Sequence, residues 1–372
     1  MFNIYFCIRY VADTITQSIM VLTDQMTYFP DDLVLTTQLL MDKSLVIYGP
    51  SGTGKSKIIV DVMAVLNPSV DQIIVISPTD PGNGTYSTGD VVPTPLIHYK
   101  LTDTLLETIW ARQEMFAAVY SRANKVTVLH SLFNRLNLVK VKDILEKAEI
   151  AKADKIREAT QQYTDKSRAG KVVEGIENEY ERFFMLVYKQ YISENRERLA
   201  RMNLNPDEAF TLRYLDFNPR LLLIFDDCTA DFKKLKSPKA KSIMGKLFFQ
   251  NRWAFITVVI ACHGDKNLDA DLRNNAFMSM WTAPNSANVY FAHEANGFTS
   301  ETAKKVSHWA PNIFKGFQKL VYIRDHDKFY KYTANLHKGF KFGSPAIRSY
   351  CKKIKSDGLS MDANNEFYQY FS

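Results

Sequence analysis

Five runs of apolar residues lie along the chain without the alternation that marks a half-exposed strand. An uninterrupted apolar run of this kind is typical of a strand that is buried on both faces of a parallel sheet. The runs are therefore interpreted as central strands. They lie within residues 44–49, 72–84, 219–232, 255–265 and 276–283.

The segment between the first two runs changes to a helical period. Ile58, Ile59, Val62, Met63 and Leu66 fall at helical spacing, which predicts a helix with one buried face. Strand, helix and strand within about 45 residues form a βαβ unit. The expected fold is therefore α/β, with a mainly parallel central sheet.

Near the other end of the chain, residues 319–334 alternate between apolar and polar positions and turn at Asp325–Asp327. This pattern predicts an antiparallel β-hairpin. We expect the hairpin to close a core domain that spans residues 41–335. Residues 1–40 are expected to form a lead-in that turns at YFPDD, and residues 336–372 a basic, aromatic tail.

The core pattern is interrupted by a helical insertion at about residues 100–205. A helix start at Thr102 precedes an apolar stripe, and residues 140–202 then carry many charged side chains at i, i+4 spacing. We expect one or two solvated helices there, broken near Gly170 or Gly175. The insertion is interpreted either as a projecting helical hairpin or as an arm that docks a protein or DNA.

Candidate chemistry follows the first central strand. Eight residues there satisfy the pattern G-x-x-x-x-G-K-[ST] between a strand and a helix. They are Gly49, Pro50, Ser51, Gly52, Thr53, Gly54, Lys55 and Ser56. Backbone N–H groups of such a loop surround phosphate oxygens, and the helix N-terminus favours their negative charge. Lys55 is expected to contact the β- and γ-phosphates of ATP, and Ser56 to supply an oxygen to Mg²⁺.

The third apolar run ends in two carboxylates, Asp226 and Asp227. Alone, such a pair would also suit a solvated strand end. Because a phosphate loop precedes it in the chain, Asp226 is expected to hold Mg²⁺, and Asp227 to orient or deprotonate the attacking water. The second acid favours a hydrolysing motor over a simple kinase or a switch.

Three further side chains are candidates for the same site. His263 follows the fourth strand, at the sheet edge where ligands gather, so it could contact the γ-phosphate or merely cap the strand. Arg252 and Arg273 flank that strand. Either could stabilise the transition state on a neighbouring subunit, as an arginine finger does, or be an ordinary surface arginine.

The charge of the chain suits a polyanionic partner. Its 47 Lys and Arg outnumber its 40 Asp and Glu, which gives a formal net charge of +7. Five lysines lie in residues 232–242, soon after the acid pair: Lys233, Lys234, Lys236, Lys239 and Lys241. A basic segment beside a hydrolysis site suits contacts with DNA phosphates, although a solvated lysine run has the same pattern.

Other features exclude several classes of protein. An apolar content of 46% with 13% aromatic residues is that of a folded globular chain. Cys7, Cys228, Cys262 and Cys351 lie far apart without a CxxC pair, which argues against a zinc knuckle or a disulfide scaffold and fits a reducing compartment. No apolar run approaches the length of a membrane span. We expect a soluble intracellular protein.

Taken together, these residues resemble the packaging ATPases of nucleocytoplasmic large DNA viruses, poxvirus-type members of the FtsK–HerA group of P-loop NTPases. The resemblance covers about residues 33–335. It rests on the segments SLVIYGPSGTGKS, IIVISPT, LLLIFDD and KLFFQNRWAFITVVIACHGDKNLDADLRNNA. It implies that the phosphate-loop strand lies beside the fourth strand.

The resemblance also implies a function. The family forms ring-shaped oligomers that use ATP and Mg²⁺ to thread double-stranded DNA into a preformed capsid. Further partners would be capsid or portal-vertex proteins, at virus assembly sites in the host cytoplasm or nucleus, or in the virion. Carried over to this chain, Lys55 and Ser56 bind the nucleotide and Asp226 the metal. Asp227 is then the hydrolytic acid, and Arg273 the favoured finger.

Three positions depart from the family pattern. Trp253 stands where His is usual after Arg252, and His263 replaces a Gln at the end of the fourth strand. Asp227 is one methylene shorter than the Glu that most motors of the broader class use, although it matches the acidic pair of viral members. The expected sensor role of His263 is therefore an altered one.

Two other functions fit the same motifs. A helicase or another DNA-repair ATPase would share the DNA-dependent turnover, but a helicase would also displace a strand. A nucleotide-gated scaffold would bind ATP tightly, hydrolyse it barely at all, and recruit partners through the charged helical insertion.

Overall fold

The computed structural model describes residues 29–163, 165–264 and 268–356. These residues form a nine-stranded sheet in the order β1-β9-β8-β7-β2-β6-β5-β3-β4. The strands are β1 (Asp31–Asp32), β2 (Ser44–Tyr48), β3 (Gln72–Ile76), β4 (Ile97–His98), β5 (Leu221–Asp226), β6 (Ile256–Cys262), β7 (Met278–Trp281), β8 (Lys319–Ile323) and β9 (Lys328–Tyr332).

The five strands predicted from the apolar runs are β2, β3, β5, β6 and β7. They pair in parallel, and β2 lies between β6 and β7. The predicted hairpin is β8 and β9, which pair antiparallel with each other, while β8 also pairs antiparallel with β7. The mainly parallel sheet, its closing hairpin and the contact between β2 and β6 are therefore confirmed.

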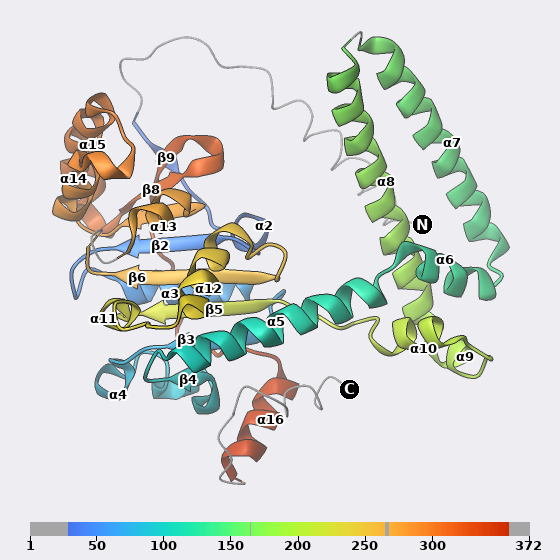
Figure 1. Cartoon of the computed structure of the whole chain (residues 1–372), viewed down its shortest axis with the longest axis horizontal. Coiled ribbons are helices and arrows are strands. Elements are labelled where there is room, and N and C mark those ends of the chain that lie inside the picture. Colours follow the sequence, from blue (N-terminus) through green and yellow to red (C-terminus); the bar gives the residue numbers. More distant parts are fainter. Residues whose placement is uncertain (1–28, 164, 265–267, 357–372) are drawn as a thin grey trace.

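Helices cover both faces of the sheet and also build an arm beside it (Figure 1). They are α2 (Thr37–Leu40), α3 (Lys55–Leu66), α4 (Asp80–Asn83), α5 (Asp103–Ala123), α6 (Val126–Arg135), α7 (Val139–Gln162), α8 (Lys166–Glu194), α9 (Arg196–Ala200), α10 (Pro206–Arg213), α11 (Thr229–Phe232), α12 (Pro238–Phe249), α13 (Ala270–Asn275), α14 (Pro284–Ala292), α15 (Ser300–Ile313) and α16 (Pro345–Ser356). Among the described helices, none is both long enough and apolar enough to cross a bilayer.

Two hydrophobic cores fill the space between the sheet and its helices. Alternate residues of each strand serve opposite faces, so Val46 and Tyr48 belong to one core and Leu45 and Ile47 to the other. The first core also contains apolar residues of α12, α14 and α15, and the second those of α3 and α16. The result is a three-layer α/β domain.

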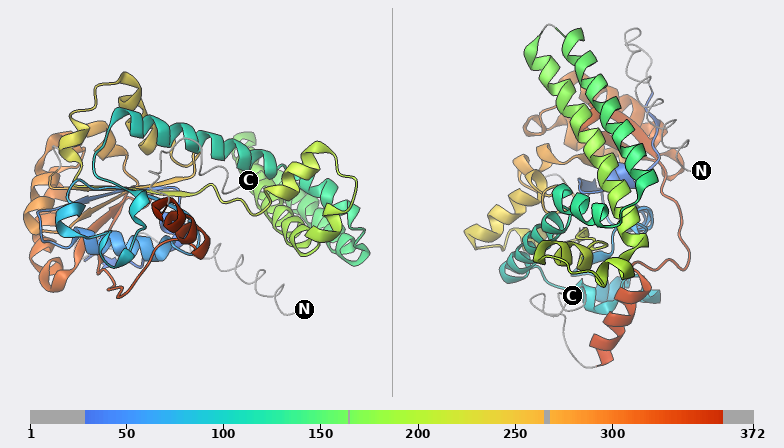
Figure 2. Two further views of the ribbon diagram at one scale, coloured as in Figure 1. Left: turned by 90° about the horizontal axis from the view of Figure 1, so that it is seen from below. Right: turned by 90° about the vertical axis from the view of Figure 1, so that its right-hand side faces the viewer.

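The helix α5 connects this domain to the arm (Figure 2, left). It begins at Thr102, whose side chain accepts a hydrogen bond from the N–H of Leu105 at 3.1 Å. Trp110 packs in the first core and Phe116 in the second. The helix α5 therefore contacts both hydrophobic cores before it leaves the sheet. It ends where the Asn124 side chain donates to the Tyr120 carbonyl, and α6 is therefore a separate helix rather than its continuation.

The arm has a hydrophobic core of its own. This third core is built from α6, α7, α8, α9 and α10 and includes Leu129, Phe133, Ile192 and Leu199. Leu215, beyond the end of α10, belongs to it as well. The insertion therefore continues past the expected end near residue 205, because the α10 segment packs on the arm and not on the sheet.

The break between the two long arm helices differs from the prediction. We expected it near Gly170 or Gly175, but α7 ends at Gln162 and both glycines lie inside α8. The new helix starts at Asp165, whose carboxylate accepts from the N–H of Ser167 at 2.9 Å. The capping carboxylate accepts a hydrogen bond from a backbone N–H at the helix start that would otherwise be unpaired. A glycine inside a long helix, by contrast, lowers its stability by only about 1 kcal/mol.

The segments before and after the expected core domain both pack onto it. In the lead-in, Asp31–Asp32 form β1 and pair in parallel with β9, where we had expected a turn. In the tail, Phe342, Ile347 and Cys351 are buried in the second core. The start of the lead-in and the last residues of the tail, at 1–28 and 357–372, lie outside the described residues.

A buried carboxylate ties the tail to the helix that follows the phosphate loop. Asp61 in α3 is 1% exposed and accepts from the Tyr332 hydroxyl and from the Asn335 N–H at 2.9 Å. The ring of His337 lies 2.7 Å from its other oxygen. This cluster joins β9, the tail and α3 at one point.

Replacing Asp61 with Ala should therefore destabilise the protein. The change leaves several donors without an acceptor, so we expect the free energy of unfolding to fall by about 3 kcal/mol in urea denaturation followed by circular dichroism. His337→Ala is the matched control, because its partly exposed contact with Asp61 should contribute about 1 kcal/mol or less. Equal losses in the two variants would show that Asp61 does not organise the cluster.

Candidate nucleotide-binding site

The predicted phosphate loop joins β2 to α3 through a close-fitting turn. Gly54 has φ of 94°, in the left-handed region that favours glycine. A Cβ on Gly49 would lie 1.8 Å from the Thr282 hydroxyl oxygen, so a side chain there would have to displace Thr282. The two glycines are thus favoured for different reasons: Gly49 because Thr282 occupies the space of a side chain, and Gly54 because its backbone is left-handed.

The lysine of the loop is held by the loop itself. Nζ of Lys55 donates to the carbonyl oxygens of Gly49 at 2.7 Å and Pro50 at 3.0 Å. Burial lowers the pKa of Lys55, and the charges of Asp226 and Asp227 oppose this effect. A cation fixed beside two carboxylates suits a site that binds phosphate together with a metal ion.

Asp226 is the last residue of β5 and is 5% exposed. The hydroxyl of Tyr86 donates to its Oδ2 at 2.9 Å. Burial raises the pKa of Asp226, while the hydrogen bond from Tyr86 and the charge of Lys55 lower it. Tyr86 was not found by sequence reasoning, because nothing local marks it as the partner of a residue 140 positions away.

Asp227 and His263 meet at the ends of neighbouring strands. Nε2 of His263 lies 2.9 Å from Oδ1 of Asp227. Asp227 has φ of 60°, a left-handed conformation that Asp tolerates better than most residues, and this turns the chain directly after β5. The two predicted residues are therefore in direct contact.

A pocket of about 280 Å³ brings these groups together. Its lining consists of Ser51, Gly52, Gly54, Lys55, Ser56, Lys57, Thr79, Asn83, Asp226, Asp227 and His263. Thr79 and Asn83 follow β3 and were missed by sequence reasoning, although their place after a buried strand is a usable signal.

The residues of this pocket fit Mg²⁺. The bond from Tyr86 uses Oδ2 of Asp226, and within the described residues Oδ1 accepts no hydrogen bond. The hydroxyl of Ser56 lines the same pocket. Both are hard oxygen ligands, and Mg²⁺ commonly takes one or two protein oxygens with phosphate and water in its other positions. No cluster of three or more His, Cys, Asp or Glu side chains suited to a metal occurs in the described part of the chain.

Neither candidate arginine lines this pocket. Arg252 is exposed at the loop before β6, and its charge acts on Asp42, just before β2. It is therefore at the edge of the sheet opposite the phosphate loop. Arg273 in α13 is 5% exposed, and its charge counteracts the burial that raises the pKa of Tyr48. In a single chain the Arg273 side chain is buried, so its guanidinium is not exposed for contact with a neighbouring subunit. The finger role of either arginine therefore stays a prediction.

Two residues from β8 and from the end of β7, on the side of β2 away from β6, support the loop. The hydroxyl oxygens of Thr282 and Thr53 lie 2.5 Å apart, and Nζ of Lys319 donates to the Thr53 carbonyl at 2.9 Å. Lys319 is 6% exposed and has no carboxylate partner among the described residues. Burial, followed by the nearby charge of Lys57, lowers its pKa.

The contact made by Lys319 orients a peptide unit. The carbonyl of Thr53 and the N–H of Gly54 belong to one planar trans unit and point in opposite directions. Gly54 lines the pocket, so the ammonium behind the loop holds a backbone donor toward the phosphate side and adds positive charge there. Sequence reasoning missed Lys319 because it lies 266 residues from its partner.

Lys319→Ala should weaken nucleotide binding. A hydrogen bond from a charged donor contributes about 1.5–3 kcal/mol, so we expect the Kd for a fluorescent ATP analogue to rise about tenfold or more. Lys331→Ala is the control, because Lys331 lies in the same hairpin and pairs with Asp32 at 3.2 Å. If Lys319→Ala lowered only the melting temperature and left the Kd unchanged, Lys319 would support the sheet and not the loop.

Comparison with solved structures finds matches of low similarity. The DNA-packaging ATPase B204 of Sulfolobus turreted icosahedral virus has a TM-score of 0.41 at 13% identity, and the match covers 80% of this chain and 100% of that one. The plasmid coupling protein TrwB has a TM-score of 0.36 at 11% identity, covering 86% and 92%. These superpositions are loose. The P-loop NTPase fold is identified instead from the strand order and from the phosphate loop between β2 and α3, which do not depend on these superpositions.

Sequence comparison gives a nearer relationship. No protein-family model matches the chain. The uncharacterized protein B354L of African swine fever virus, from a Kenyan pig isolate, is 35% identical over 349 residues, which cover 89% of this chain and 93% of B354L. B354L of a Malawian tick isolate matches with the same identity and coverage. The chain therefore belongs to the family of B354L, a protein of a nucleocytoplasmic large DNA virus.

Proposed function

We propose that this protein is an ATP-hydrolysing motor that moves double-stranded DNA during viral genome packaging. The observation that carries the proposal is the pair Asp226 and Asp227 at the end of β5, which lines one pocket with Lys55 and Ser56 of the phosphate loop. Nucleotide binding alone requires the loop and one carboxylate. A second carboxylate in contact with a histidine supports hydrolysis.

Each residue then has a role in the reaction. The loop and Lys55 bind the phosphates of ATP, and Ser56 and Asp226 would hold Mg²⁺, which would neutralise charge on those phosphates. Asp227 orients the attacking water and accepts its proton. His263 restrains the Asp227 carboxylate through their 2.9 Å contact, in the position where the family resemblance implies a γ-phosphate sensor.

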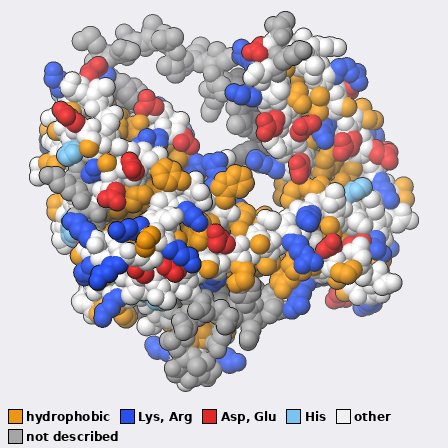
Figure 3. All heavy atoms as spheres, viewed as in Figure 1, with side chains coloured by type: hydrophobic (Ala, Val, Ile, Leu, Met, Phe, Trp, Pro, Cys, Tyr) orange, Lys and Arg blue, Asp and Glu red, His pale blue; other side chains and the backbone are white. Residues whose placement is uncertain are grey.

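DNA would contact the lysines that follow the acid pair. Lys233, Lys236 and Lys241 are exposed and have no ion-pair partner in the described part of the chain, whereas Lys234 pairs with Asp231 and Lys239 with Glu107. Figure 3 shows Lys and Arg side chains gathered over α11 and α12. The short helix α11 separates this segment from the hydrolytic acid, so a rearrangement at Asp227 would reach it through α11.

Assembly into a ring with a capsid partner is the remaining part of the proposal. Its support is the membership of a viral family and the resemblance of the motifs to ring-forming motors. In such a ring, a neighbour would supply the finger, and we assign this role to Arg273 with Arg252 as the alternative. Either arginine must then change its surroundings on assembly, because one is buried and the other lies at the opposite sheet edge.

The direct test is ATP turnover by protein of known oligomeric mass, with and without long duplex DNA. Asp227→Asn should lower kcat by about 100-fold or more, as expected for loss of a general base, and should keep ATP bound. Asp207→Asn, an exposed change on the arm, should turn over normally. Negligible turnover by the unchanged protein, with and without DNA, would contradict the motor and favour a scaffold; strand displacement would favour a helicase.

A second measurement addresses the DNA contact. Changing Lys233, Lys236 and Lys241 to Ala should reduce DNA-stimulated turnover and make DNA binding less dependent on salt concentration, because fewer counterions are released. The matched control changes Lys352, Lys353 and Lys355 of α16, which are also exposed. An unchanged salt dependence in the first variant would exclude this segment as the DNA contact.

A further inference from the structure

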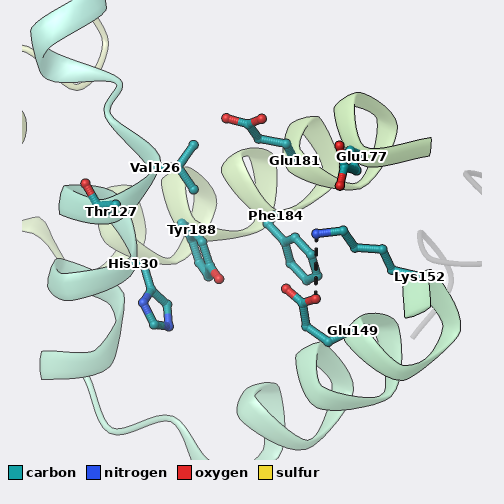
Figure 4. Close-up of a pocket in the computed structure, with 9 residues that line it drawn as sticks. All are labelled: Val126, Thr127, His130, Glu149, Lys152, Glu177, Glu181, Phe184 and Tyr188. Carbon is teal, nitrogen blue, oxygen red and sulfur yellow. Dashed lines mark ion pairs between the residues drawn. The ribbon is translucent and has the colours of Figure 1, made fainter. Parts of the chain in front are cut away.

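The arm contains a hollow that is separate from the nucleotide pocket. It lies between α6, α7 and α8 (Figure 4) and has two lobes of about 450 and 620 Å³. The lobes share His130, Glu149, Phe184 and Tyr188. Each lobe is larger than the 280 Å³ pocket at the phosphate loop.

One face of α8 supplies both carboxylates and aromatic rings to this hollow. Glu177, Glu181, Phe184 and Tyr188 line it, and their spacing of four, three and four residues places them in a single stripe. The rings form the floor, since Phe184 is 5% and Tyr188 is 6% exposed. The glutamates stand at the rim in solvent.

The negative charges at the rim reduce the stability of α8. Glu177 and Glu181 are like charges at i, i+4, an arrangement that costs a few tenths of a kcal/mol, roughly what an opposite pair would contribute. Neither has an ion-pair partner within the described residues. Glu149 on α7 faces them across the hollow, and its nearest cation is Lys152 at 3.8 Å. The negative charge at this rim is therefore only partly balanced by the arm itself.

The floor carries a polar atom without a partner. Tyr188 is packed against the ring of Phe133, with centroids 5.1 Å apart, yet its hydroxyl makes no hydrogen bond within the described part of the chain. Figure 4 shows that hydroxyl directed into the space between His130 and Phe184. The ring is buried but the hydroxyl opens into the hollow, so it is a hydrogen-bonding group that a ligand with a polar group can reach at the floor of the hollow.

We propose that this hollow binds an arginine-bearing segment of a partner protein. A guanidinium is flat, always charged and carries several donors in one plane. It can donate to the hydroxyl of Tyr188 and form a bidentate pair with a rim carboxylate. A lysine ammonium offers none of the planar contacts.

Other ligands fit the hollow less well. Nucleic acid would be repelled by the glutamates, because its own phosphates are negative. The described residues offer no group of three or more metal-ligating side chains. The proposal gives the arm a docking role, and it does not rest on the proposed motor activity.

The test is fluorescence anisotropy of a short labelled peptide that carries arginines, titrated with the full chain. The same peptide with lysine, and with glutamate, in place of arginine provides the comparison. We expect the arginine peptide to bind most tightly and the glutamate peptide not to bind. The double variant Glu177→Gln with Glu181→Gln should raise the Kd about tenfold or more, and Tyr188→Phe about threefold to tenfold.

The control removes two negative charges elsewhere on the arm. Glu158→Gln with Glu179→Gln changes exposed residues that do not line the hollow, and it should leave the Kd within about twofold. ATP turnover should be unchanged in all variants, so loss of peptide binding is distinguishable from failure of the motor. The proposal is overturned if both double variants weaken binding equally or if lysine binds as well as arginine. It is also overturned if the rim glutamates alter only self-association, which would make the hollow a contact between copies.

Discussion

The parallel pairing of β2 with β6, and of β6 with β5, decides where the chemistry of this protein can occur. In the register of the sheet, Tyr48 is opposite Cys262, and Asp226 is opposite Ala261. The three strands therefore end at nearly the same level. The phosphate loop, His263 and Asp227 are the next residues of their strands, so a single pairing pattern gathers groups from three distant parts of the sequence. Without it, the motif between β2 and α3 would be a glycine-rich turn with no acid beside it.

Much of this arrangement was predictable because it follows from local pattern. Fully apolar runs identify strands that are buried on both faces, and polar residues at the ends of such runs identified Asp226, Asp227 and His263. Contacts made across the sheet were not predictable. Lys319 and Tyr86 each reach the site from positions whose local sequence is ordinary. The burial of Arg273 was missed for the same reason, since a single arginine in a short helix carries no signal of what covers it.

The arm illustrates a different limit. Its charged composition correctly predicts exposed helices, yet the position of the break depends on a capping aspartate and not on the glycines, because the cost of an interior glycine is small in a long helix. The residues that form its core are sparse and spread over five helices, so no short window reveals them. The arm is thus a folded unit with its own core, and its surface can change in evolution without disturbing the sheet.

The attachment of the lysine segment has a mechanical consequence. The N–H and hydroxyl of Ser237 donate to Asp103 at 2.8 Å and to Glu107 at 3.0 Å, and both carboxylates belong to the first turns of α5. A helix of 21 residues is about 30 Å long, and α5 is anchored in the core at this end and continues into the arm at the other. Any displacement of the segment after Asp227 therefore acts on the short end of a stiff rod. The far end, which carries the whole arm, would move through a larger arc than the site that started the motion.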